Sequence, residues 1–317
     1  DQQTEPSLML HGGAGSKIRD KKRAKAVERA LSELRDELYE LLREGAEAGD
    51  VVVEGCRRLE EDPNFNAGKG AVLQADGQIR LSAALMDGPK RAFSGVINAQ
   101  NLEHPIELAE YLQGEQDRVL AGQGVTALLR ELDVPYYDPM TEKRLKEWVK
   151  QRKENFDAEM AQVVSGAGDE PGHGTIGVVA RDGQGRVSAG TSTGGRGFEH
   201  VGRVSDSAMP AGNYAGEVAA VSCTGIGEDI IDDCAAARMV VRATDGMSLR
   251  GAFERTFEEA EEDDHSYAAI GVAADGGLAW GKTTDVLLAA WHDGRRRGHT
   301  LNLAEGMIIE SRASRSP

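Results

Sequence analysis

The sequence predicts an α+β fold in which stacked antiparallel sheets are covered by helices. Strand-like and helix-like segments come in blocks, whereas a parallel doubly wound sheet needs them in alternation. The 39 glycines among 317 residues point to many tight turns and close backbone contacts. Hydrophobic residues form 40% of the chain and aromatic residues only 5%, so we expect a large core of aliphatic side chains.

The first half of the chain carries clear helix signals. Apolar residues from Val27 to Leu42, Leu41 among them, recur at spacings of three and four, which predicts a helix with one buried stripe. Asp50 is the expected N-cap of a second helix, and Asp62–Pro63 its expected stop. In this half we expect helices at 17–44, 51–61, 105–112 and 125–132.

Strands are expected between these helices. Asp76–Gly77 is a strong hairpin signal for the apolar segments on either side of it. The segment His11–Gly15 follows the first strand, and its glycines suit a positive φ or a close backbone approach. Strands are expected at 7–11, 71–73, 78–85 and 93–99.

The composition changes in the middle of the chain. A charged, helix-prone segment at 141–160 precedes a loop-like run at 165–172, so we expect a mobile linker at about 150–174. Beyond it, helices are expected at 229–241 and 248–262, and strands at 175–180, 186–193, 218–224, 267–273, 278–282 and 286–291.

The charge balance excludes whole classes of partner. Asp and Glu number 53 against 37 Lys and Arg, a formal net charge of −16. Nucleic acids and anionic membranes need a positive surface, so we expect neither as a partner. The acidity fits either ordinary solubility or a high-salt habitat.

The expected compartment is the cytoplasm. Cys56, Cys223 and Cys234 are odd in number and form no CxxC, so the sequence predicts neither a disulfide framework nor a zinc ribbon. No apolar run approaches the ~18 residues that a membrane span needs, and the first residues lack the basic segment of a signal peptide.

Two short patterns are open to a chemical interpretation but favour ordinary structure. Gly190–Gly194 matches the nucleophile elbow of α/β-hydrolases, with Ser192 as the serine, yet the Gly-rich residues that follow are a poor helix start. Asp263–His265 is expected to be a solvated helix end rather than a metal site.

Thr175 is the most informative residue, because it lies where the expected linker meets a buried strand. Cleavage of the bond before it would give one residue both a hydroxyl and a free α-amine. An α-amine has a pKa of about 7.7–8.0, so it can accept the hydroxyl proton without a histidine. Gly174 has no Cβ and would tolerate the strained carbonyl geometry of an acyl shift.

The chain resembles the N-terminal-nucleophile hydrolases of the plant-type asparaginase and isoaspartyl peptidase family. The resemblance covers roughly residues 7 to 290 and rests on ordered motifs at His11–Gly15, Phe65–Gly68, Met86–Gly88, Gly174–Gly177, Thr191–Gly195, Gly202–Ser207 and Ser222–Glu228. It implies a single domain over residues 1–317, a four-layer αββα sandwich. Autoproteolysis at Gly174/Thr175 would divide it into an α chain, 1–174, and a β chain, 175–317.

The resemblance also implies roles for individual residues. Thr175 would be the nucleophile, Thr193 would hydrogen-bond to it, and Asn66 would hold its surroundings. The Thr224 hydroxyl and the Gly225 N–H would form an oxyanion hole. The expected substrate-binding residues are Arg203 for the α-carboxylate, Asp206 for the α-amine and Gly227 beside that amine.

A sodium ion is expected by the same resemblance. Its ligands would be backbone carbonyls in one loop, those of Leu59, Glu60, Asp62, Phe65, Ala67 and Lys69. The resemblance implies no cofactor for the chemistry, and it implies an (αβ)2 homodimer of processed precursors.

The expected reaction is hydrolysis of the β-amide of L-aspartyl compounds, isoaspartyl dipeptides or L-asparagine. Glycoasparaginase activity, a taspase-like protease and a catalytically silent amino-acid-binding homologue are the alternatives. Arg203 and Asp206 form the expected substrate clamp, and Ser205 between them replaces the glycine that is usual in the family. The preferred substrate therefore stays open.

Overall fold

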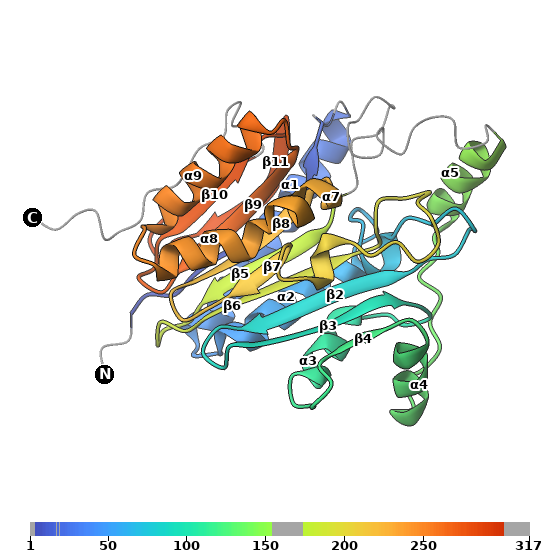
Figure 1. The fold of residues 1–317 in the computed structure, drawn as a ribbon, viewed down its shortest axis with the longest axis horizontal. Helices are drawn as coiled ribbons and strands as arrows, with labels where there is room; N and C mark the ends of the chain where they lie inside the picture. The colour runs from blue at the N-terminus through green and yellow to red at the C-terminus, as the bar shows by residue number, and fades with distance from the viewer. Residues whose placement is uncertain (1–3, 17, 19, 154–173, 301–317) are drawn as a thin grey trace, which may run out of the picture.

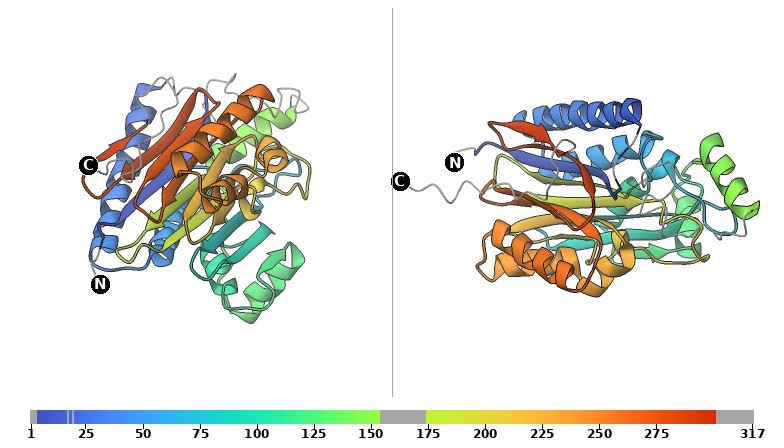
Figure 2. Two further views of the ribbon diagram at one scale, coloured as in Figure 1. Left: turned by 60° about the vertical axis from the view of Figure 1, so that its left-hand side comes forward. Right: turned by 90° about the horizontal axis from the view of Figure 1, so that it is seen from above.

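The structure, a computed structural model, describes residues 4–16, 18, 20–153 and 174–300. Two sheets stack face to face, and helices cover the outer face of each (Figures 1 and 2). The first outer layer contains α1 (Lys21–Arg43), α2 (Ala48–Glu61) and α3 (Pro105–Leu112), and the second contains α8 (Ala235–Thr244) and α9 (Leu249–Glu262). This is the expected αββα sandwich.

Within the described residues, the larger sheet has eight strands in the order β12-β11-β1-β5-β6-β2-β3-β4. Neighbouring strands are antiparallel except β3 and β4, which are parallel. The strands are β1 (Ser7–Gly15), β2 (Leu81–Asp87), β3 (Ala92–Ala99), β4 (Val119–Ala121), β5 (Ile176–Arg181), β6 (Val187–Thr193), β11 (Val286–His292) and β12 (Arg297–His299).

The smaller sheet has four strands in the described part of the chain, in the order β10-β9-β8-β7. They are β7 (Asn213–Ala215), β8 (Ala219–Gly225), β9 (Tyr267–Ala273) and β10 (Leu278–Lys282). The short strands β4, β7 and β12 have no counterpart in the sequence prediction, because three residues are too few to show a hydrophobic period.

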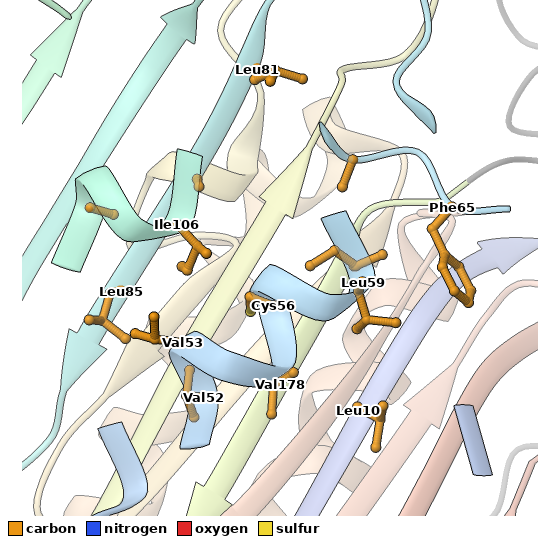
Figure 3. Close-up of a cluster of buried hydrophobic side chains, with 14 of the residues drawn as sticks. Leu10, Val52, Val53, Cys56, Leu59, Phe65, Leu81, Leu85, Ile106 and Val178 are labelled. Atoms are coloured by element: carbon orange, nitrogen blue, oxygen red, sulfur yellow. The ribbon is translucent and has the colours of Figure 1, made fainter. Parts of the chain in front are cut away.

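The hydrophobic core has three layers, as a four-layer fold requires. Under the first helices, Cys56 and Leu59 of α2 lie over the larger sheet near Val178 (Figure 3). Phe253 of α9 belongs to the cluster beneath the second helical layer. Trp280 is fully buried in the cluster between the two sheets.

The N-terminal helices differ from the prediction at their ends. The Asp20 carboxylate caps α1 by accepting the N–H groups of Lys22 and Arg23. Leu41 is 37% exposed, so it does not belong to the buried stripe. Helix α2 begins at Ala48, and Asp50 lies in its first turn rather than at the N-cap.

Tertiary structure explains that early start. The Ala48 N–H donates to the Asp182 carboxylate, 3.2 Å away, from a part of the chain that no local pattern connects to it. The end of α2 at Asp62 is confirmed.

The prediction that two paired strands flank Asp76–Gly77 is wrong. The turn itself forms, with Gly77 at φ +78° and the Asp76 carboxylate accepting the Gln78 N–H. However, β2 begins only at Leu81 and pairs with β3 and β6. Residues 73–75 instead exchange backbone hydrogen bonds with residues 198–199.

The prediction of one continuous helix at 229–241 is also wrong. Cys234 has φ +49°, in the left-handed region, and divides the segment into α7 (Gly227–Asp233) and α8. The first of the two helices, α7, begins two residues after β8 ends, next to the expected site residues Thr224 and Gly225.

The described residues also form α4 (Gln123–Glu131) and α5 (Glu142–Lys153). Residues 150–153 of the expected linker form the end of α5, and residues 154–173 lie outside the described residues. None of the described helices combines the length and the apolar character that a membrane span needs.

Candidate active site

Thr175 directly precedes β5, and its hydroxyl contacts a second threonine. Thr175 Oγ1 donates to Thr193 Oγ1 at 3.0 Å. Thr193 is the last residue of β6, the antiparallel neighbour of β5, so strand pairing brings the two threonines together. The Gly195 N–H also donates to Thr193 Oγ1, at 3.1 Å, which fixes this hydroxyl from the other side.

Asn66 connects the bond before Thr175 to the turn after β6. Its backbone N–H donates to the Gly174 carbonyl at 3.3 Å, and its side-chain amide donates to the Gly195 carbonyl at 2.6 Å. The Asn66 carbonyl accepts the Gly194 N–H. A donor at the Gly174 carbonyl stabilises negative charge that develops there if a nucleophile attacks it.

Glycine is required at position 174 for a reason that the sequence argument did not contain. Gly174 is not among the residues with positive φ. A β carbon on it would instead collide with the backbone of Gly13 in β1 and lie 2.9 Å from the Ala14 nitrogen. Close packing against β1 therefore requires a glycine at this position.

The expected oxyanion donors, Thr224 and Gly225, are the last two residues of β8. The Thr224 hydroxyl is buried and has no hydrogen-bond partner among the described residues. Gly225, with φ +138°, packs against the backbone of Tyr267. A buried donor without a partner costs free energy, so a hydroxyl held in this way is suited to binding an oxyanion.

The expected substrate clamp surrounds a glycine. A β carbon on Gly227, the first residue of α7, would lie 2.6 Å from Arg203 Nη2 and 2.9 Å from Asp206 Oδ1. The glycine thus keeps the space beside both charged groups open. Burial raises the pKa of Asp206 to about 7, although the positive charge of Arg203 opposes the shift.

One cavity brings these groups together. Its lining contains every residue expected for catalysis, autocleavage and substrate binding: Asn66, Gly174, Thr175, Thr193, Arg203, Asp206, Thr224, Gly225 and Gly227. Ala14, Gly195, Arg196 and Ser205 line it as well. Arg196 is the charged residue that the sequence analysis missed, because no spacing pattern distinguishes it from other surface arginines.

Comparison with known proteins agrees with this arrangement. A family model described as Asparaginase matches residues 4–302. The chain belongs to this asparaginase family. The expected family, the N-terminal-nucleophile fold class and the assignment as a hydrolase are confirmed.

Three relatives illustrate the range of similarity. Isoaspartyl peptidase/L-asparaginase of Nostoc sp. is 52% identical over 317 residues, covering 98% of both chains. The Synechocystis sp. protein of the same name is 50% identical, covering 95% of this chain and 92% of its own. Plant-type L-asparaginase of Pyrococcus abyssi is 33% identical, covering 88% and 93%.

The loop expected to bind sodium in this asparaginase-family chain runs from α2 to a short 3₁₀ helix, Gly68–Gly70. Gly68 has φ +47°, and a β carbon on it would collide with the Glu60 carbonyl. A β carbon on Gly70 would likewise collide with the Phe65 carbonyl. The glycines therefore let the backbone lie close to two of the expected carbonyl ligands, and carbonyl oxygen is a ligand type that a hard cation prefers.

A buried polar network behind the nucleophile was not predicted. His11 Nε2 and Ser222 Oγ lie 2.9 Å apart, and Ser222 Oγ lies 2.7 Å from Thr191 Oγ1, which donates to Asn213. Burial lowers the pKa of His11 to about 3, so its imidazole is neutral. A β carbon on Gly177 would strike both His11 and Ser222, so the network fixes β5 two residues beyond Thr175.

Ser192, the serine of the elbow pattern, has a structural environment. It is fully buried and donates to Glu60 Oε1 at 2.6 Å. No helix follows it within residues 194–199, which are all described. The elbow interpretation therefore lacks both the exposed hydroxyl and the helix that it needs.

The segment Asp263–His265 makes side-chain contacts that a solvated helix end would not make. His265 Nδ1 lies 3.1 Å from Asp233 Oδ2, and the Tyr267 hydroxyl donates to the same oxygen at 2.8 Å. Asp233, Asp263 and His265 have ligand atoms within 4.8 Å of one another, close enough to hold a metal ion. Arg238 lies 3.7 Å from Asp233 and supplies positive charge there already.

Proposed function

We propose that this chain hydrolyses the β-amide bond of L-aspartyl compounds, isoaspartyl dipeptides and L-asparagine, with Thr175 as the nucleophile. The observation that carries the proposal is that the Thr175 hydroxyl, the unpartnered Thr224 hydroxyl and the Arg203–Asp206 pair line one cavity. An aspartyl group presents an α-carboxylate, an α-ammonium and a β-carbonyl. These three groups match an arginine, an aspartate and an oxyanion donor.

The first reaction of the precursor is self-cleavage. The Thr175 hydroxyl attacks the Gly174 carbonyl carbon, whose oxygen accepts the Asn66 N–H. The C–N bond breaks, the amide becomes an ester on Thr175 Oγ1, and the α-amine is released. Water then hydrolyses the ester, so one domain over 1–317 becomes an α chain, 1–174, and a β chain, 175–317.

Turnover uses the two groups that cleavage leaves on Thr175. Its neutral α-amine accepts the hydroxyl proton while the oxygen attacks the β-carbonyl of the substrate. Thr224 Oγ1 and the Gly225 N–H stabilise the oxyanion, and Thr193 orients the nucleophile at 3.0 Å. The leaving amine takes the proton, an aspartyl ester remains on Thr175, and water releases aspartate.

A structural sodium ion, a homodimer and a cytoplasmic location complete the proposal. The carbonyls of Leu59, Glu60, Asp62, Phe65, Ala67 and Lys69 would hold the sodium, which would stabilise the loop below Asn66 and take no part in the chemistry. The (αβ)2 homodimer is supported by the family resemblance. Three free cysteines, two of them buried, support a reducing compartment.

Aspartate release from purified protein tests the function. We expect release from β-Asp-Leu and from L-asparagine, and none from Thr175→Ala. Thr126→Val in α4, a residue outside the cavity lining, is the matched control and should behave as wild type. Release from glycoasparagine alone would support the glycoasparaginase alternative, and no release from any substrate would support a silent homologue.

A further inference from the structure

A second cavity lies between α3 and the chain that follows α4; both helices are labelled in Figure 1. Its volume is about 300 Å³, at the lower end of the range for small-molecule sites. No described residue lines both this α3–α4 cavity and the catalytic cavity. The proposed hydrolysis therefore makes no use of it.

The wall of the α3–α4 cavity is fixed by backbone hydrogen bonds. The Val134 N–H donates to the Leu129 carbonyl at 2.9 Å, which holds the chain against the end of α4. The Tyr137 N–H donates to the Asn101 carbonyl at 3.1 Å, which holds the same chain against the segment before α3. The cavity is therefore preformed, so a ligand does not have to order its wall.

Aliphatic side chains give this cavity an apolar lining. Leu102, Leu108 and Leu129 line it and are buried. Leu132 and Val134 line it as well, and they are 37% and 39% exposed, so part of the apolar lining is in contact with water. A ligand with an apolar part would cover this surface and gain free energy from the hydrophobic effect.

Carboxylates give the α3–α4 cavity its charge. Glu103 and Glu107 line it, and each of these side chains is 51% exposed. None of the described residues in the lining is Lys or Arg. Burial and the negative charge of Glu103 raise the pKa of Tyr137, another lining residue, so its hydroxyl stays neutral near this carboxylate.

The positive groups near the cavity already have carboxylate partners. His104 lines the cavity, and its Nδ1 lies 3.5 Å from the fully buried Glu60 carboxylate. Arg57 Nε lies 3.9 Å from Glu107, whereas Arg57 Nη1 donates to Glu61 at 2.6 Å. The lining therefore favours a positively charged ligand and repels an anion.

Three tyrosines, Tyr111, Tyr136 and Tyr137, add aromatic rings to the lining. The face of an aromatic ring attracts a cation, and aromatic cages bind quaternary ammonium groups in this way. A bare divalent metal ion fits less well, because it needs several oxygen ligands around one point and the lining is largely apolar. The combination of rings, carboxylates and leucines thus matches an organic cation.

We propose that the α3–α4 cavity binds a small organic cation, an alkylammonium ion. Its charged head would lie near Glu103, Glu107 and the tyrosine rings, and its chain would contact the leucines. The carboxylates select for positive charge, the tyrosines for an ammonium head and the leucines for an alkyl chain. This site is separate from the catalytic cavity and does not depend on the proposed function.

Calorimetric titration with three probes of one chain length separates charge from apolar contact. Hexyltrimethylammonium has a positive head, hexan-1-ol a neutral head and hexanoate a negative head. We expect wild type to bind hexyltrimethylammonium about tenfold more tightly than hexan-1-ol and not to bind hexanoate. The double variant Glu103→Gln/Glu107→Gln should bring the ratio of the two affinities to about one. Tyr136→Leu, which keeps an apolar side chain, should weaken ammonium binding about threefold.

Two control variants locate the binding. Glu33→Gln removes a carboxylate from an exposed pair on α1 and should keep the wild-type ratio. Asp206→Asn removes a carboxylate from the catalytic cavity and should keep it as well. Loss of ammonium binding in Asp206→Asn would place the ligand in the catalytic cavity and overturn the proposal.

The titrations can also overturn the proposal directly. Wild type that fails to bind hexyltrimethylammonium, or that binds hexan-1-ol equally well, would contradict it, and so would an unchanged ratio in the double variant. If the ammonium does not bind and Tyr136→Leu changes the sedimentation coefficient of the protein, a second copy of the chain covers the cavity and the proposal is wrong.

Discussion

Gly13 and Gly174 pack backbone against backbone, because a β carbon on either residue would collide with the main chain of the other. Gly13 lies in β1 with φ +118°, and Gly174 carries the carbonyl that Thr175 would attack. The two glycines thus hold the bond to be cut against the C-terminal end of β1, where the Asn66 N–H donates to the Gly174 carbonyl at 3.3 Å.

Gly174→Ala should slow self-cleavage by about 100-fold, because the added methyl group must move the carbonyl away from Asn66 or displace β1. Intact-mass measurement over time gives the cleaved fraction. Gly124→Ala in α4 is the control, since its β carbon meets nothing within 4 Å, and it should cleave at the wild-type rate. Wild-type cleavage of Gly174→Ala would contradict the packing argument.

Thr224→Val tests the oxyanion donor. Loss of the hydroxyl should lower kcat by about 100- to 1000-fold with little change in KM, since the hydroxyl acts on the transition state. The assay must be normalised to the fraction of chain cleaved at 174/175. A kcat within a few fold of wild type would assign the role to another group.

Asp206 predicts how substrate binding depends on pH. Only its ionised form pairs with the substrate's α-ammonium, and its pKa is raised to about 7 by burial. The KM should therefore rise as the pH falls below about 7, separately from the effect of the Thr175 amine on kcat. A KM that stays constant from pH 8 to pH 5.5 would contradict this assignment.

The same carboxyl group predicts a change in stability. Its folded pKa of about 7 exceeds the ordinary 3.8, so the folded state binds more protons and loses stability as the pH rises between these values. Asp206→Asn should raise the melting temperature at pH 8 and lose that gain as the pH falls toward 4, while binding substrate poorly. A destabilised variant at pH 8 would argue that the ionised carboxylate is well compensated.

Ser192→Ala separates a structural serine from a nucleophile. The variant loses a 2.6 Å hydrogen bond to the buried Glu60 carboxyl group and should unfold more easily by about 1–3 kcal/mol. Aspartate release should persist, and urea denaturation measures the stability loss. A folded Ser192→Ala protein without hydrolysis would restore the elbow interpretation.

Sodium removal tests the expected ion loop. An ion that binds only the folded state raises stability with the logarithm of its concentration. The melting temperature should be higher in NaCl than in choline chloride of equal ionic strength, and the difference should grow with salt concentration. Equal melting temperatures in the two salts would argue against a sodium site.

The sequence predicted the elements that have a regular hydrophobic period or that contain a motif. The stripe from Val27 to Leu42 and the strands around Thr175 follow local periodicity, and the structure contains them. The early start of α2 depends on Asp182, and the break at Cys234 depends on a left-handed residue that no local pattern marks. Such features come from tertiary contacts that a single sequence does not display.

The candidate site likewise combines residues that the sequence predicted with contacts that it did not predict. Motif order placed all nine catalytic, cleavage and substrate residues, and the structure gathers them in one cavity. Arg196 Nη1 lies 3.6 Å from the Glu228 carboxylate, a contact between residues 32 positions apart that no spacing pattern indicates. The His11–Ser222 pair joins residues 211 positions apart, a relationship that spacing cannot predict.

Intact-mass spectrometry of the freshly purified and the incubated wild-type protein tests the central claim most directly. The account predicts that one chain becomes two, with the boundary between Gly174 and Thr175, and that aspartate release from β-Asp-Leu grows in step with the cleaved fraction. A chain that hydrolyses β-Asp-Leu while remaining whole, or after a cut at another bond, would contradict Thr175 as an N-terminal nucleophile.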